Sequence, residues 1–199
     1  MLNKERKQLI SFLTSPEVVL NNGPSDVIKV PKEVFLFVRN LYNTKIVEVY
    51  KNYYVNPKFC NTVTDRAWVI KRRIPAHMVA CVQTATWIYT GNNFEKLVLN
   101  HKKITCITEN ICITDHGLFK EDVIEINNLL ITSPARTLID MIRYEKKLSP
   151  YDLSFFKNLS GIYEITYDSL MNCLDRMRDF KRIDRVHDVL CRYGFLPEL

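Results

Sequence analysis

The stretch Ile131-Thr132-Ser133-Pro134-Ala135-Arg136-Thr137-Leu138-Ile139-Asp140 decides how the second half of the chain folds. Ser133 suits a helix N-cap because its hydroxyl oxygen can accept a hydrogen bond from a free backbone N–H, and Pro134 suits the first helical position. Arg136 and Asp140 are four residues apart, so they can form an ion pair on one helix face. We therefore predict a strand that ends near Thr132 and a helix whose signature residues are structural.

Short segments rich in β-branched residues precede this stretch. Strands are predicted at 97–99, 104–107, 111–113, 123–126 and 129–131. Asn127-Asn128 separates the last two, and asparagine tolerates the left-handed conformation that a two-residue hairpin turn needs. The predicted helix at 134–142 would lock these strands to the helices that follow it.

Three further helices are expected after the signature. The first begins at Ser149-Pro150, the second runs from about Asp168 to Met177, and the third runs from about Arg182 to Cys191 with Gly194 as its stop. Before the strands, residues 62–74 are typical of a short helix or connector, and 76–89 of a buried apolar helix that Gly91 ends.

The first third of the chain has a different pattern. A helix is predicted over 3–13, Ser25 caps a short segment over 26–29, and a third helix opens at Pro31 and runs over 32–42. Two β-branched and aromatic runs, 46–50 and 53–55, flank Lys51-Asn52 as a hairpin. This order predicts a winged helix-turn-helix over residues 1–58. The whole chain is then α+β, with a second, mixed α/β domain over 59–199 that has a small sheet and C-terminal helices.

Charge is distributed unevenly between the two regions. Residues 1–73 hold 13 Lys/Arg and 6 Asp/Glu, whereas residues 74–199 hold 15 and 16. A basic segment with a helix that can enter the major groove predicts double-stranded DNA as a partner. The side chains that we expect to contact DNA are Lys29, Lys32, Arg39, Asn40, Lys45 and Lys51. Arg39 and Asn40 suit base edges, and Lys45 and Lys51 suit phosphates. The alternative is a winged helix that makes only protein contacts.

Composition and residue spacing argue against a membrane protein, a secreted protein, a metalloprotein and an enzyme. The chain has no apolar run long enough for a membrane span, and its first residues lack the pattern of a signal peptide, so we expect a cytoplasmic protein. The six cysteines and four histidines lack metal-ligand spacing, and the five glycines form no phosphate loop. We predict no catalytic residue, no metal and no cofactor. Arg136 as an anion site and Cys81 as a nucleophile are the enzyme-like alternatives, and an inert core thiol is favoured for Cys81.

The signature and its surroundings resemble the AbiE-type antitoxins of type IV toxin–antitoxin pairs. Residues 131–140 are similar to the family's V-T-S-P-A-R-T-L-x-D, residues 84–91 to its S/T-A-x-W-L-x-G helix, and residues 36–55 to its winged-helix end. The resemblance covers roughly residues 25–145. The family often has glycine where Asn43 or Thr44, Asn52 and Asn128 stand in this sequence, and Cys81-Val82 replaces a common Ser-His. No Glu-x-Asp-Gly motif of the endonuclease-like relatives follows.

This resemblance implies a function that the residue pattern alone does not. Such antitoxins repress their own operon through the winged helix, which typically binds inverted repeats in the promoter. They also counteract a nucleotidyltransferase-like toxin without a stable complex. Two alternatives remain: a stand-alone regulator without a toxin, and a protein-interaction module that does not bind DNA.

Overall fold

The computed structural model describes residues 28–29, 47–50, 53–55, 60–71, 73–91, 97–101, 106–107, 111–115, 117–144 and 150–196. The strands in these ranges are β1 Ile28–Lys29, β2 Val47–Tyr50, β3 Tyr53–Val55, β4 Val79–Ala80, β5 Leu97–Asn100, β6 Cys106–Ile107, β7 Ile111–Thr114, β8 Val123–Ile126 and β9 Leu129–Thr132. The helices are α4 Val63–Lys71, α5 Val82–Thr90, α6 Pro134–Tyr144, α7 Pro150–Tyr163, α8 Tyr167–Arg176, α9 Ile183–Arg192 and the 3-10 turn η2 Lys120–Asp122. The α+β class predicted from the sequence is thus confirmed for the described residues.

A small antiparallel sheet forms near the N-terminus, with the strand order β1-β3-β2. The predicted hairpin is confirmed, because β2 pairs with β3 from Val47 opposite Val55 to Tyr50 opposite Tyr53. The short helix predicted over 26–29 is wrong for its last two residues, because Ile28 and Lys29 form β1 and pair with β3. Val55 is almost fully buried and belongs to the main hydrophobic core.

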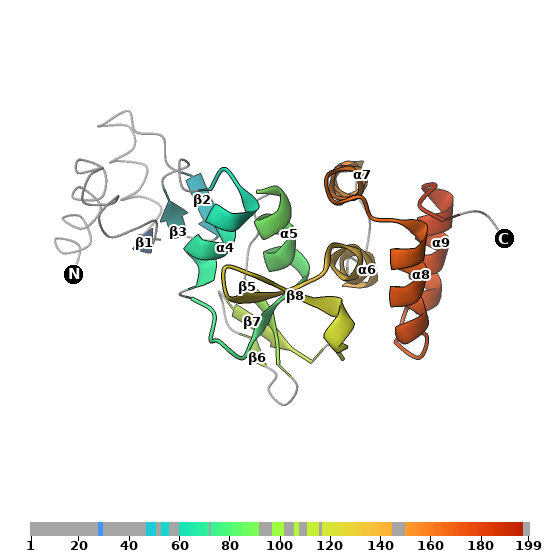
Figure 1. Cartoon of the computed structure of the whole chain (residues 1–199), viewed down its shortest axis with the longest axis horizontal. Coiled ribbons are helices and arrows are strands. Elements are labelled where there is room, and N and C mark those ends of the chain that lie inside the picture. The colour runs from blue at the N-terminus through green and yellow to red at the C-terminus, as the bar shows by residue number, and fades with distance from the viewer. Residues whose placement is uncertain are drawn as a thin grey trace.

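The larger sheet is mixed, with the strand order β6-β7-β5-β4-β9-β8. Its β4–β9 and β5–β7 pairs are parallel, and the other pairs are antiparallel. Figure 1 shows α4 and α5 above this sheet, and both helices contact its strands. The buried face toward these helices includes Ala80, Leu99 and Ile131, each at most 1% exposed. Burial of these side chains removes apolar surface from water and stabilises the layer.

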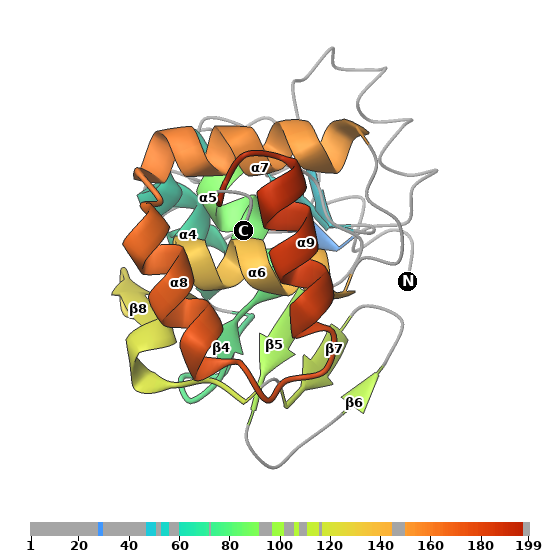
Figure 2. The same ribbon diagram turned by 90° about the vertical axis from the view of Figure 1, so that its right-hand side faces the viewer.

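Helix α6 forms the centre of the second half. It packs against α5 on one side and against α7, α8 and α9 on the others. Figure 2 shows α8 and α9 side by side in front of α6, with α7 crossing above. The residues of α6 from Ala135 to Arg143 are all buried. The prediction that this helix joins the sheet to the C-terminal helices is therefore confirmed.

Local sequence explains where several elements begin and end. Thr62 and Asp65 form a reciprocal capping box at the start of α4, with their backbone N–H groups bonded to each other's side chains at 3.0 and 3.1 Å. Gly91 ends α5 with φ of 79°, as predicted. Asn127 and Asn128 both have positive φ, 52° and 56°, which is the conformation that a tight hairpin turn requires.

The helix predicted over 76–89 is correct only in part. Val79 and Ala80 form the strand β4, which lies between β5 and β9, and the helix begins at Val82 after an extended Cys81 with φ of −141°. The hydrophobic run does not distinguish a buried strand from a buried helix, and the partners of β4 come from distant parts of the chain. In the part of the chain that the structure describes, no helix is long and apolar enough to cross a membrane.

Candidate functional site

The predicted DNA-contacting residues are mostly outside the described ranges. Lys29 lies in β1, where its backbone pairs with Tyr53. Lys32, Arg39, Asn40, Lys45 and Lys51 lie outside the described residues, so their role in DNA binding stays a prediction. The signature residues, by contrast, lie in a well-defined junction between β9 and α6.

Ser133 caps α6 as the sequence predicts. Its side-chain oxygen accepts a hydrogen bond from the backbone N–H of Arg136 at 3.3 Å, and Pro134 is the first helical residue. The backbone N–H of Ser133 donates to the carbonyl oxygen of Asp122 at 2.8 Å. Ser133 therefore provides a hydrogen-bond acceptor for a free backbone N–H at the start of the helix, and its own backbone bonds to the residue that precedes β8.

Thr132 fixes the other side of the junction. Its hydroxyl is 2.7 Å from that of Thr137, one turn into α6, and both side chains are fully buried. Its carbonyl oxygen accepts a hydrogen bond from the hydroxyl of Tyr89 at 2.6 Å. These bonds join β9 to α5 and α6, because buried polar atoms must find partners inside the protein.

Arg136 lies at the centre of a buried ion-pair cluster. Its Nε donates to Asp140 Oδ2 at 2.8 Å, which confirms the predicted pair, and its Nη1 donates to Asp122 Oδ2 at 2.6 Å. All three side chains have no exposed surface. Each carboxylate also forms an ion pair with a second arginine: Arg143 bonds Asp140 at 3.0 Å, and Arg176 bonds Asp122 at 2.6 Å. We call these five residues the arginine–aspartate cluster.

Electrostatics keep the central cation charged. Burial lowers the pKa of Arg136, but Asp140 and Asp122 together raise it above its ordinary value. For Asp140, burial raises the pKa, and the guanidinium groups of Arg136 and Arg143 oppose this effect. Removing these charges from water is costly, so each group relies on its partners in the cluster.

An aromatic ring covers the cluster and lies close to Gly117. The Phe180 ring centroid is 5.6 Å from Arg136 Cζ and 5.1 Å from Arg143 Cζ, distances typical of cation–π contacts. A Cβ on Gly117 would lie 2.7 Å from Phe180 Cζ, and Gly117 has φ of +61°. A side chain at this position would require the Phe180 ring to move, and the positive φ adds a backbone cost for most residues other than glycine.

Sequence reasoning missed most of this cluster. Asp122, Arg143 and Arg176 were not predicted as partners of the signature, although Asp122 is fully buried. Arg143 carries a weak signal, because it is three residues after Asp140 on the same helix. Asp122 and Arg176 are 54 residues apart, and no local spacing reveals a contact of that kind.

Arg66 is a second buried arginine that the sequence analysis did not single out. It donates to the carbonyl oxygens of Ile88 and Tyr89 at 2.7 and 2.9 Å, and to that of Cys60 at 2.9 Å. Its guanidinium therefore caps the C-terminal turn of α5 and joins it to the chain before α4.

The candidate nucleophile Cys81 lies in the core. It is fully buried, and burial raises the pKa of its thiol, which opposes formation of the reactive thiolate. Cys173 is also buried, and burial raises its pKa to about 12. Among the described residues, no group of three or more His, Cys, Asp or Glu side chains could hold a metal ion. These observations favour the inert-thiol interpretation of Cys81 made from the sequence.

Comparison with known protein families finds no match, and comparison with curated proteins finds none. The charged groups of the arginine–aspartate cluster form ion pairs with one another around α6, the helix that joins the sheet to the C-terminal helices. The cluster's chemistry is that of a structural junction.

Proposed function

We propose that this protein is a DNA-binding autorepressor and the antitoxin of an AbiE-like type IV pair, opposing a nucleotidyltransferase-like toxin. It would bind duplex DNA in its own promoter through residues 1–58 and act in the cytoplasm. The region from 59 to 199 would regulate that binding or oppose the toxin, without a catalytic residue or cofactor. The resemblance in the signature stretch supports the antitoxin part of the proposal.

The observation that carries the DNA-binding part is the location of the positive charge. Residues 1–73 contain 13 basic and 6 acidic side chains, and the remainder of the chain is nearly balanced. A concentrated positive field attracts the phosphates of DNA and releases their counterions on binding. The same region contains the sheet β1-β3-β2, in which a short strand that precedes the predicted recognition helix pairs with the second strand of the hairpin. A winged helix has this strand order, so the sheet supports the proposal.

A DNA-binding titration tests this part. Fluorescence anisotropy of the full chain with its own promoter DNA would be measured from 50 to 200 mM salt. If the four predicted lysines each neutralise one phosphate, affinity falls roughly a hundredfold over this range. Affinity that is absent at 50 mM, or that does not change with salt, would contradict DNA binding and favour the protein-interaction alternative.

Two variants separate base contacts from phosphate contacts. Arg39→Ala should weaken binding to the promoter by about 1–3 kcal/mol while changing binding to random DNA much less. Lys51→Ala should weaken both similarly. Lys157→Gln is a matched control, because Lys157 is exposed on α7 in the second region. Equal losses on promoter and random DNA for Arg39→Ala would show that Arg39 does not read a base.

The antitoxin part needs a separate experiment. A nucleotidyltransferase-like gene next to this one, if present, would be expressed alone and together with this protein, and growth would be followed. Restored growth supports the antitoxin assignment. DNA binding with unrelieved toxicity, or with no such neighbouring gene, would favour the stand-alone regulator.

A further inference from the structure

A cavity of about 530 Å³ lies between the larger sheet and the segment that leads into β8. The sheet contributes Val79, Asn100 and Leu130, and the segment contributes Leu118, Phe119 and Lys120. This volume lies within the range of small-molecule sites in proteins. The lining shares no residue with the predicted DNA-contacting set or with the arginine–aspartate cluster.

Strand register explains why these side chains meet. Val79 is paired with Asn100, and Ala80 is paired with both Leu99 and Ile131. Because side chains alternate between the two faces of a strand, Ala80, Leu99 and Ile131 point to the helices, and Val79 and Asn100 point to the opposite face. The cavity therefore lies on the face that α4 and α5 do not cover.

Asn100 is the unusual residue in this cavity. It is only 3% exposed, and its side-chain Nδ2 is the one fully buried side-chain nitrogen or oxygen in the described ranges without a hydrogen-bond partner. A buried amide that has lost water and gained no partner destabilises the fold. A polar group retained under these conditions needs an explanation, and a bound acceptor atom would provide one.

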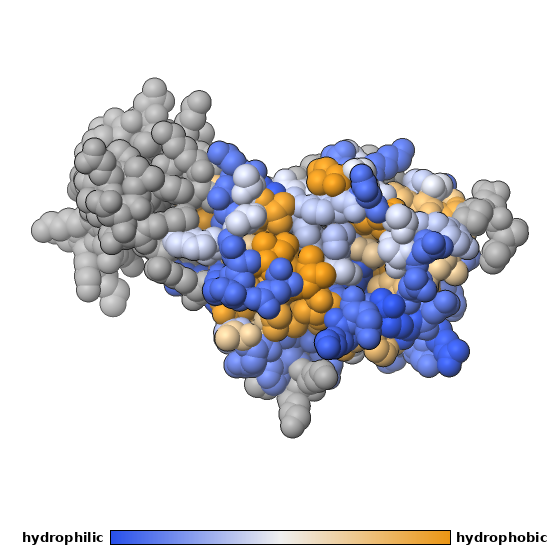
Figure 3. Space-filling model, in the orientation of Figure 1, coloured by the Kyte–Doolittle hydropathy of each residue, from blue (hydrophilic) through white to orange (hydrophobic). Residues whose placement is uncertain are grey.

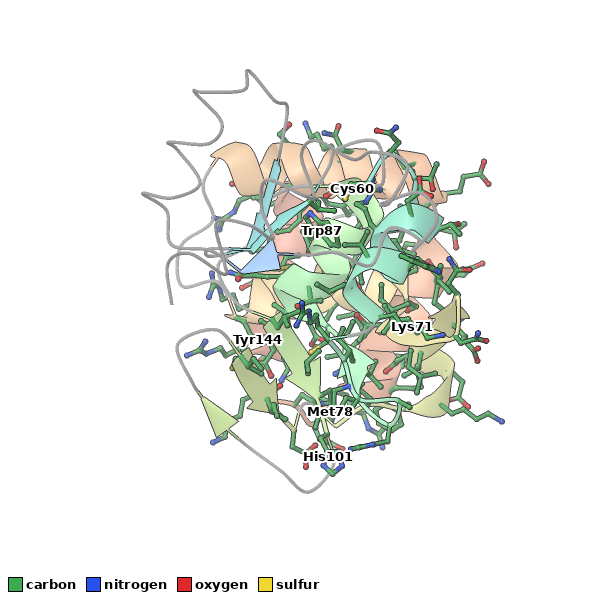
Figure 4. The ribbon with its side chains drawn as sticks, turned by 90° about the vertical axis from the view of Figure 1, so that its left-hand side faces the viewer. Cys60, Lys71, Met78, Trp87, His101 and Tyr144 are labelled. Carbon is green, nitrogen blue, oxygen red and sulfur yellow. The ribbon has the colours of Figure 1, made fainter. Side chains whose placement is uncertain are left out.

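The other polar side chains of the lining are basic or neutral. They are His77, His101 and Lys120, and none of the described residues of the lining carries a carboxylate. The two imidazole rings meet edge to face with their centroids 5.2 Å apart. Figure 4 shows His101 beside Met78 at the far end of the sheet from Cys60. A cavity with a buried donor and a nearby lysine favours a ligand with a negatively charged acceptor.

Apolar side chains form the rest of the wall. Leu118, Val123 and Leu130 line it, and Phe119, 37% exposed, is at its rim. Figure 3 shows apolar side chains gathered in the middle of the face that it draws, over the elements labelled α5 and β8 in Figure 1. A fully hydrated ion such as phosphate would leave these walls unused. A ligand with an apolar body fits them better.

We propose that this cavity binds a small carboxylic acid with an apolar body. Asn100 Nδ2 has almost no exposed surface, so binding requires the amide to rotate toward the cavity, where Nδ2 donates a hydrogen bond to the carboxylate. The carboxylate also faces the ammonium group of Lys120. The apolar body lies against Leu118, Val123 and Leu130. This site is independent of the proposed DNA and toxin functions.

The test uses 2-naphthoate as the probe and its neutral analogue 2-naphthylmethanol as the comparison. Calorimetric titration of the full chain should show saturable binding of 2-naphthoate with Kd below about 1 mM. The alcohol should bind at least about tenfold more weakly, because it lacks the charge that Asn100 and Lys120 recognise. No saturable binding, or equal binding of the two compounds, would overturn the proposal.

Asn100→Leu distinguishes a binding role from a structural one. Leucine has a similar size and removes the unpaired amide, so the melting temperature should stay unchanged or rise. The affinity for 2-naphthoate should fall roughly ten- to a hundredfold. Unchanged affinity in a folded variant would show that the amide does not contact the ligand.

Lys120→Gln gives a second measurement that does not depend on a core substitution. Lys120 is exposed, so this variant should fold normally, lose several-fold in affinity for 2-naphthoate and bind the alcohol as before. Lys157→Gln, on α7, is the control and should bind both compounds like the parent chain. Equal affinities of the Lys120 and Lys157 variants for 2-naphthoate would place the probe elsewhere.

Discussion

Replacing Arg136 by alanine removes the cation that joins the two buried carboxylates of the arginine–aspartate cluster. Arg136 is bonded to Asp140 at 2.8 Å and to Asp122 at 2.6 Å, and all three side chains are fully buried. After the substitution each carboxylate keeps one arginine, Arg143 or Arg176, but loses half of its charge compensation. The variant also leaves a void where the guanidinium lay against Phe180.

The magnitude follows from these contacts. Breaking a buried ion pair by removing one partner destabilises a protein by about 3–5 kcal/mol, because the remaining charge is buried without compensation. For a chain of this size, 1 kcal/mol corresponds to roughly 2–4 °C in melting temperature. We therefore expect Arg136→Ala to melt roughly 6–20 °C below the parent protein.

Thermal and urea denaturation followed by circular dichroism measure this change. Arg178→Ala is the control, because the Arg178–Asp179 contact of 3.9 Å lies on the surface with both side chains more than four-fifths exposed. Its stability should stay within about 0.5 kcal/mol of the parent. Arg136→Lys keeps the positive charge but lacks the planar guanidinium that bonds both carboxylates. Its stability should therefore lie between that of Arg136→Ala and that of the Arg178→Ala control.

One result would refute the structural role of Arg136. If Arg136→Ala melts within about 2 °C of the parent and yet fails to oppose a partner toxin, the side chain contributes to function rather than to stability. A loss of stability accompanied by a loss of activity would support the role proposed from the geometry.

Two smaller changes test the local geometry around the same junction. Ser133→Ala removes the cap of α6 and should lower the free energy of unfolding by about 0.5–2 kcal/mol in urea denaturation. Ser133→Asp keeps a capping oxygen and should retain most of the parent's stability. Equal stability of all three proteins would contradict the cap. Asn128 has φ of 56° in the β8–β9 turn, so Asn128→Gly should stabilise the protein by up to about 1 kcal/mol and Asn128→Ala should destabilise it by a similar amount. The reverse order of those two variants would show that the turn has another conformation.

Features that depend on neighbouring residues were predictable from the sequence. The Ser133 cap, the Asn127-Asn128 turn, the Arg136–Asp140 pair and the stop at Gly91 each require residues no more than four or five apart. Their side chains have conformational preferences that act within one turn, so the pattern of residues specifies them. The predicted strands at 123–126 and 129–131 follow from the same local rules.

Features that depend on distant pairing were not predictable. Strand β4 has only two residues, and Ala80 is in register with Ile131, which is 51 positions away. Nothing in the apolar run from 76 to 89 indicates where a strand ends and α5 begins. The unpaired amide of Asn100 is equally hidden in the sequence, because its environment comes from β4, β9 and the segment before β8. Such contacts are set by the packing of whole layers rather than by propensity.

The signature illustrates why a sequence pattern can indicate local structure without indicating a partner. Its polar side chains bond inward: Ser133 to the start of α6, Thr132 to Thr137, and Arg136 to two carboxylates. Substitutions at these positions would disturb the junction between the sheet and the C-terminal helices, whatever the protein binds. Discrimination between DNA sequences or partners requires side chains that reach the surface, where substitutions change binding at little cost in stability. Tests of the proposed DNA binding should therefore use the predicted contacts Arg39 and Lys51, and the signature residues should serve as controls for folding.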